Sequence, residues 1–170
     1  EFPNITSVFE WSYSNGEWST VSSLFENTVF YLGTSGYWQR GHRYANMALE
    51  AARQSGERST LALYRHAFGW LLWKQGDYQA AREQLETARQ MHIESGDMGW
   101  AAWAMLTSAK SAIAQDDLES ANEMVSELLR STGDAAIQMV EHGLLTVQGR
   151  IALEQGDLDT AKDYLIRALA

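Results

Sequence analysis

The sequence predicts an all-α protein of about four helix–turn–helix repeats, preceded by a short helix. Two observations, the recurring motif and the scarcity of proline, support this expectation. A glycine- or aspartate-centred motif recurs at a constant interval, at positions 36, 76, 116 and 156. The 170 residues contain one proline, Pro3, so nothing interrupts long helices. No residue is a cysteine, which excludes disulfides, thiolate metal sites and cysteine nucleophiles.

The recurring motif marks the turn inside each repeat. Four segments align, and the second residue of each can adopt the left-handed conformation that ends a helix: Gly36, Gly76, Asp116 and Gly156. In three segments an aspartate follows that is suited to cap the next helix: Asp77, Asp117 and Asp157. Two columns of small residues predict close helix crossings: Gly41, Ala81, Ala121 and Ala161, then Gly69, Ala109 and Gly149.

Each repeat therefore consists of helix A, a tight turn, helix B and a loop. We expect helix A at residues 18–34, 58–75, 98–115 and 135–155. We expect helix B at residues 38–54, 78–94, 118–131 and 158–170. An opening helix at 4–14 ends at Asn15-Gly16, a turn signal. The predicted organisation is a leading helix in 1–16 and one repeat domain in 17–170, with repeats at 17–56, 57–96, 97–133 and 134–170.

These columns resemble the tetratricopeptide repeat (TPR), most clearly at Gly69, Gly76, Asp77, Tyr78, Ala81, Leu85 and Ala88. The resemblance covers residues 18–170 and implies a right-handed α–α superhelix. The period, given by the step from Gly36 to Gly76, is longer than the usual length of about 34 residues. The proline that often ends helix B is also missing. Long repeats of this kind resemble those of bacterial STAND-type signal-transduction ATPases and transcription regulators.

The first residues add to this resemblance. The stretch from Glu1 to Trp11 is similar to the segment that opens the repeat region of such regulators, where it follows a nucleotide-binding module. The sequence contains no Walker motif, so an ATPase would lie elsewhere in a longer protein. A start without methionine and an end inside a helical pattern also indicate a fragment.

In the TPR family, helix A lines the concave face. The resemblance therefore implies a partner-binding face made of Phe30, His66, Trp70, Trp73, Lys74, Trp103, Leu106, Lys110 and Arg150. Tryptophan and arginine often dominate binding energy, so a peptide with an apolar anchor and an acidic residue fits this face. Two alternatives stay open: the tryptophans fit a core between repeats, and Lys110 and Arg150 fit pairing with nearby acids. The columns that bind chaperone C-termini in this family hold His66 and Trp70, so chaperone binding is not expected.

The sequence shows no catalytic constellation, and we expect neither enzymatic activity nor a cofactor. No two of the four histidines are three or four residues apart, as a helical metal pair requires: His42, His66, His92 and His142. The paired aspartates at 116–117 and at 157 and 159 fit turn caps better than metal ligands. No nucleophile elbow is present.

Two functions follow from these expectations. The first is an interaction module for a peptide or partner domain. The alternative is a sensor arm of a larger regulator that binds a protein or small-molecule inducer, the latter in a pocket around Trp70, Trp73 and Trp103. A net charge of −9 opposes nucleic-acid binding. Without a signal peptide or an apolar run of about 20 residues, we expect a cytoplasmic protein. An uncapped last repeat exposing Tyr164, Leu165 and Leu169 favours homo-oligomers.

Overall fold

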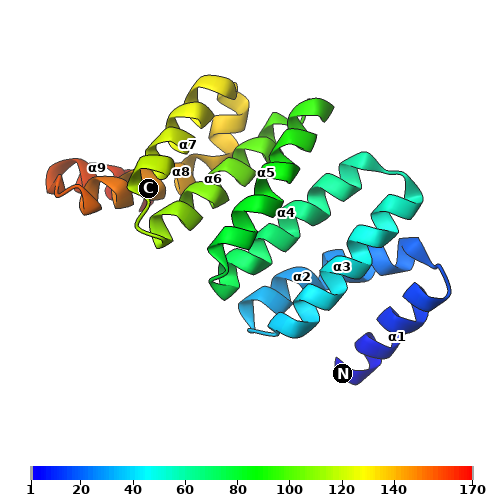
Figure 1. The fold of residues 1–170 in the computed structure, drawn as a ribbon. Coiled ribbons are helices and arrows are strands. Elements are labelled where there is room, and N and C mark those ends of the chain that lie inside the picture. Colours follow the sequence, from blue (N-terminus) through cyan, green and yellow to red (C-terminus); the bar gives the residue numbers. More distant parts are fainter. Residues whose placement is uncertain (1, 170) are drawn as a thin grey trace. The chain divides into compact units, whose positions relative to one another are not determined.

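Helices make up almost all of the described chain, residues 2–169 of a computed structural model (Figure 1). In that range there is no strand, and the helices are α1 (Phe2–Ser14), α2 (Trp18–Thr34), α3 (Trp38–Ser55), α4 (Arg58–Gln75), α5 (Tyr78–Ser95), α6 (Met98–Ala114), α7 (Leu118–Ser131), α8 (Asp134–Glu154) and α9 (Leu158–Leu169). The all-α helix–turn–helix prediction is confirmed. Glu1 of the opening motif and Ala170 of the last expected helix lie outside the described residues, as do the side chains of Phe2 and Pro3.

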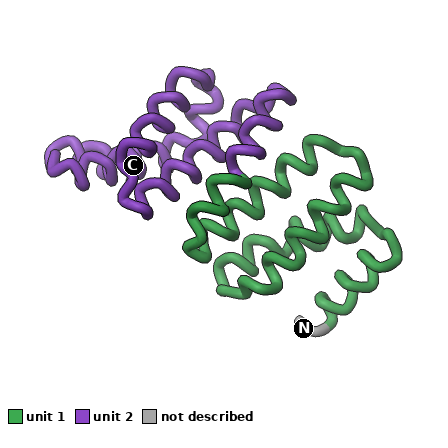
Figure 2. Tube along the Cα trace, viewed as in Figure 1, with its two compact units in different colours: residues 1–84 green, residues 85–170 purple. Residues whose placement is uncertain are grey.

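The chain divides into two compact units, residues 1–84 and 85–170 (Figure 2). In the first unit, α1 packs against α2 and α3, and α2 packs against α3 and α4. In the second unit, α6 packs against α7 and α8, and α8 packs against α7 and α9. Each unit therefore places two A helices side by side, α2 with α4 and α6 with α8.

Left-handed residues separate the helices at a fixed interval. Positive φ angles occur at Gly16, Gly36, Gly56, Gly76, Gly96, Asp116 and Gly156. Asp116, with φ of 59°, adopts the conformation expected from its place in the motif. The interval equals half of the repeat, because the turns between repeats end helices in the same way as the turns within them.

The turn between α7 and α8 departs from this interval. Thr132 and Gly133 have extended backbones there, with ψ angles of 141° and 168°. The chain thus leaves α7 early, after 14 residues, and α8 extends to 21 residues. The longer A helix compensates for the shorter B helix, so the next left-handed residue, Gly156, returns to the common interval.

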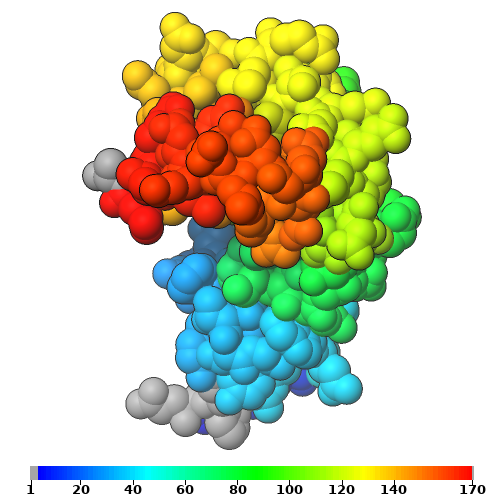
Figure 3. All heavy atoms as spheres, turned by 90° about the vertical axis from the view of Figure 1, so that its left-hand side faces the viewer, coloured from blue at the N-terminus to red at the C-terminus, as the bar shows by residue number. Residues whose placement is uncertain are grey.

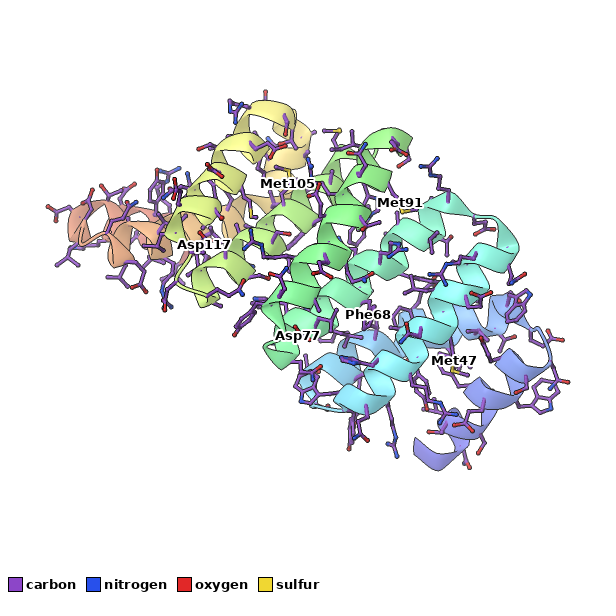
Figure 4. The ribbon with its side chains drawn as sticks, viewed as in Figure 1. Met47, Phe68, Asp77, Met91, Met105 and Asp117 are labelled. Atoms are coloured by element: carbon purple, nitrogen blue, oxygen red, sulfur yellow. The ribbon has the colours of Figure 1, made fainter. Side chains whose placement is uncertain are left out.

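Aspartates cap the B helices, as predicted. The Oδ1 atom of Asp77 accepts a hydrogen bond from the Ala80 amide at 3.3 Å, and Asp117 and Asp157 accept equivalent bonds at 3.1 Å. Figure 4 labels Asp77 and Asp117 at the starts of α5 and α7. Hydrogen bonds from Thr160 lower the pKa of Asp157. These carboxylates therefore act as helix caps at the turns.

Helix α1 ends in the manner of a B helix. Gly16 stands one full repeat before Gly56, and both have left-handed backbones. The Glu17 amide donates to the Ser12 carbonyl at 2.9 Å, a bond that A and B helices both form at their ends, so the place of Gly16 in the repeat is what aligns α1 with the B helices. The repeat pattern thus extends into α1, which the sequence had suggested only as a leading helix.

Each unit has a core of its own. In the first unit, Phe9 stacks on Tyr44 with ring centroids 4.0 Å apart, and the Tyr44 hydroxyl is 2.8 Å from Thr6 Oγ1. In the second unit, a Cβ at Gly149 would lie 2.8 Å from Leu165 Cγ, so α8 and α9 approach closely there. This contact confirms the close approach predicted at Gly149.

Candidate partner-binding surfaces

In the first unit, Phe30 of α2 and Trp70 of α4 form an aromatic pair. Their rings stack with centroids 5.6 Å apart and an angle of 14° between the planes. The Phe30 side chain is 70% exposed, whereas Trp70 is half-buried. The stack restricts the rotation of the exposed Phe30 ring, so little side-chain freedom would be lost if the ring were covered.

Gly33 makes room for this pair. It is buried, and a Cβ there would lie 2.7 Å from Trp70 Cη2 and still closer to Cζ3. The indole therefore packs directly on the α2 backbone. Gly33 lies outside the small-residue columns of the repeat, so no column pointed to this role.

Lys74 adds a positive charge beside the aromatic pair. Its Nζ atom lies 6.0 Å from the ring centroid of Trp70 and 5.5 Å from that of Trp73. Cation–π contacts at these distances are weak when exposed, about 0.5–1 kcal/mol, but they hold the ammonium in place. The structure thus brings together Phe30, Trp70, Trp73 and Lys74, four residues of the predicted face.

His66 lies inward from this surface. It is only 7% exposed, so its side chain is buried in the unit and offers little surface to a partner. One turn before Phe30, Glu26 accepts a hydrogen bond of 2.6 Å from the Tyr64 hydroxyl. Burial and this bond raise the pKa of Tyr64. The bond joins α2 to α4 beside the aromatic pair.

In the second unit, Trp103 and Lys110 of α6 are half-buried, but Leu106 is fully buried. A Cβ at Gly143 of α8 would lie 2.5 Å from Leu106 Cδ2 and 3.7 Å from Lys110 Nζ. Leu106 therefore fills the space beside a glycine and packs in the core, where no partner can reach it. Its assignment to the binding face is corrected on this ground.

The two cations of this unit differ in their surroundings. Burial lowers the pKa of Lys110. Arg150 is exposed and pairs with Glu154 one turn along α8, with Nε 2.8 Å from Oε1. This pair matches the alternative of local charge pairing left open for Arg150. Such exposed pairs contribute about 0–1 kcal/mol, so Glu154 can give way to another carboxylate.

Met139 extends the surface of the second unit and was missed by the sequence analysis. It is 55% exposed, and its sulfur would lie 2.6 Å from a Cβ at Gly99 of α6. Methionine adapts its shape to different partners, which makes it frequent at binding surfaces. Gly99 and Met139 occupy equivalent positions in consecutive repeats, but this equivalence does not indicate that Met139 is exposed.

Neither surface has the composition of a metal site. Among the described residues, no three histidine, aspartate or glutamate side chains gather closely enough to hold a metal ion. None of the described helices combines the length and the hydropathy needed to cross a membrane.

The fold and these surfaces define a helical repeat protein. Residues 72–141 match the family model of the tetratricopeptide repeat, so the resemblance seen in the sequence is confirmed over this stretch. The chain is also 24% identical, over 174 residues, to the transcription activator GutR of Bacillus subtilis (strain 168). That match covers 99% of the chain and only 20% of GutR. Tetratricopeptide repeats are a non-catalytic fold that generally mediates protein–protein interactions.

Proposed function

We propose that the chain is a non-enzymatic interaction module that binds a peptide or partner domain on its A helices. The exposed stack of Phe30 on Trp70 carries this proposal. Covering the Phe30 ring would recover about 25 cal/mol for each Å² of apolar surface removed from water. The pair is positioned before a partner arrives, so little free energy is spent on ordering it.

The second unit offers a similar combination of groups. Half-buried Trp103 and Lys110 lie on α6, and exposed Met139 and Arg150 lie on α8. A partner lying along these two helices would meet an aromatic ring, a thioether and two cations. Both units therefore support binding of segments that combine apolar and acidic side chains, the ligand type expected from the sequence.

The test is a binding measurement on the purified chain with a peptide library and fluorescence polarisation. Phe30→Ala and Trp103→Ala should each weaken binding to the unit that carries them. Leu129→Ala is the matched control, because Leu129 is an exposed apolar residue on a B helix, 43% accessible. An equal loss in the control, or no binding to any peptide, would reject the proposal.

The alternative function is a sensor arm of a larger regulator. Its support is the similarity to a transcription activator, of which the chain spans 20%. If the chain senses a small inducer, a compound from a metabolite panel should raise its melting temperature, and peptides should not. The opposite result would exclude a small-molecule inducer, leaving a protein inducer as the form of this alternative.

Charge and exposure bear on two further kinds of partner, nucleic acid and a second copy of the chain. Residues 85–170 contain 14 acidic and 6 basic side chains, so this unit should repel nucleic acid. Helix α9 faces the viewer in Figure 3. Its residue Leu169 is 86% exposed, which supports self-association. Light scattering that shows only monomers at high concentration would contradict self-association. A cytoplasmic location remains part of this proposal.

A further inference from the structure

A second aromatic and cationic group adjoins the Phe30 pair. Tyr31, the next residue of α2, stacks with Tyr37, with centroids 5.9 Å apart and planes at 29°. The Arg40 guanidinium carbon lies 5.6 Å above the Tyr37 ring. All three side chains are exposed. Because Phe30 and Tyr31 are consecutive, the two groups lie on adjacent faces of α2 near its C-terminal end.

We call this region the turn surface, consisting of Phe30, Tyr31, Tyr37, Arg40 and Lys74. It contains two rings on α2 and two cations, each cation held over an aromatic ring. Beside it lies a hollow of about 450 Å³ lined by residues Gly36, Tyr37, Trp38, Gln39 and Arg40. The hollow is open to solvent and shares Tyr37 and Arg40 with the turn surface.

The first A–B turn differs in charge from the other A–B turns. Where Tyr37 stands, the later repeats carry capping aspartates. Where Arg40 stands, they carry the uncharged residues Ala80, Ser120 and Thr160. The first A–B turn thus replaces a carboxylate by a phenol and adds a cation. Such a surface complements a negatively charged ligand within an acidic protein.

We propose that the turn surface binds an acidic segment of a partner protein that contains an aromatic residue between carboxylates. The aromatic side chain packs on Phe30 and Tyr31, and the carboxylates accept charge-assisted hydrogen bonds from Arg40 and Lys74. The cation–π contacts hold both cations ready for this role. The proposal names the partner chemistry of the interaction module and rests on that proposed function.

The experiment uses a short dye-labelled peptide with a tryptophan flanked by aspartates, titrated with the whole chain. We expect it to bind at least about tenfold more tightly than the same peptide with flanking lysines or with alanine in place of tryptophan. Arg40→Glu with Lys74→Glu should reverse the preference in favour of the lysine peptide. The matched control, Arg53→Glu with Arg130→Glu, makes the same change of net charge elsewhere and should keep the original preference.

Three results would overturn this inference: no preference for the acidic peptide, the same reversal in the control variant, or tighter binding of a single-stranded thymidine oligonucleotide. The last would indicate a nucleic-acid surface, since stacking rings and cations also suit single strands. If the acidic peptide fails while library peptides still respond to Phe30→Ala or Trp103→Ala, the inference fails and the interaction module stands. If no peptide binds at all, both fail.

Discussion

The Phe30 ring lies almost parallel to the Trp70 indole, with an angle of 14° between them, and it is the more exposed of the two. Since Phe30 belongs to α2 and Trp70 to α4, the pair joins the A helices of two neighbouring repeats at the surface. The contact therefore serves two purposes, packing between repeats and presentation of an apolar ring to a partner. The variants below separate these purposes.

Replacing Phe30 by alanine should cost little stability. The ring is mostly exposed, so the loss is that of one aromatic contact, about 1 kcal/mol. Trp70 gains solvent exposure, which should shift tryptophan emission to longer wavelength. Urea unfolding and fluorescence measure both effects, with Phe30→Tyr as the control that keeps the stack. A loss above about 3 kcal/mol would indicate a core residue.

Replacing Gly33 by alanine should destabilise the first unit by about 1–3 kcal/mol, although alanine favours helices. The new Cβ would meet the rigid Trp70 indole at 2.7 Å or less. Gly99→Ala is the matched helical control, because its Cβ would meet the flexible end of the exposed Met139. We expect the control to be neutral or stabilising. Thermal melts in which Gly33→Ala is as stable as wild type would contradict the tight contact.

Tyr64 should make stability depend on pH in the alkaline range. Burial and the Glu26 hydrogen bond raise the pKa of Tyr64 in the folded chain. The folded state then keeps a proton that the unfolded state loses near pH 10, so stability falls as pH rises above about 10. Tyr64→Phe should show a weaker fall, at a cost of about 1 kcal/mol at neutral pH from the lost bond. Urea unfolding at pH 9 and 11 measures the change in the free energy of unfolding. The same change in wild type and Tyr64→Phe would refute this assignment.

His92 should make stability depend on pH in the acidic range. Burial lowers the pKa of His92, and the nearby Asp97 only partly offsets this effect. The unfolded state therefore binds the proton more readily, and folding stability is lost as pH falls through about 6.5. His92→Gln should reduce the slope of stability between pH 7 and pH 5, whatever its effect at pH 7. The prediction fails if both proteins lose the same stability over that range.

The corrected position of Leu106 leads to a further expectation. Leu106→Ala should cost about 2–5 kcal/mol, because it removes a fully buried side chain packed beside Gly143. Leu153→Ala, at a position 45% exposed on α8, should cost much less. Chemical denaturation of both variants measures the difference. Similar small losses would place Leu106 on the surface after all.

The repeat columns allowed the helices to be predicted, since each column depends on local chemistry. Left-handed turns need glycine or a tolerant substitute such as Asp116, and helix starts need a cap such as Asp77. These requirements concern a few consecutive residues and repeat unchanged along the chain. The helices of the repeats consequently begin and end within one residue of their expected bounds.

The orientation of side chains between helices could not be predicted in the same way. Trp70 packs on Gly33 and stacks with Phe30, and both of these residues belong to the preceding repeat. Which residues meet depends on how two A helices cross, and the columns do not contain that information. Leu106 and Met139 show the result, since the expected surface residue is buried and an unexpected one is exposed.

The regular interval between left-handed residues has a consequence for changes in chain length. Excising one whole repeat between equivalent glycines, such as Gly36 and Gly76, would join an A helix to the following B helix with every column still aligned. Excising half a repeat would put a B sequence into an A position and bury the wrong side chains. The shortened α7 and lengthened α8 show that a local departure is tolerated when its neighbour restores the count. We therefore expect the chain to tolerate the gain or loss of whole repeats, and most other insertions within its helices to destabilise it.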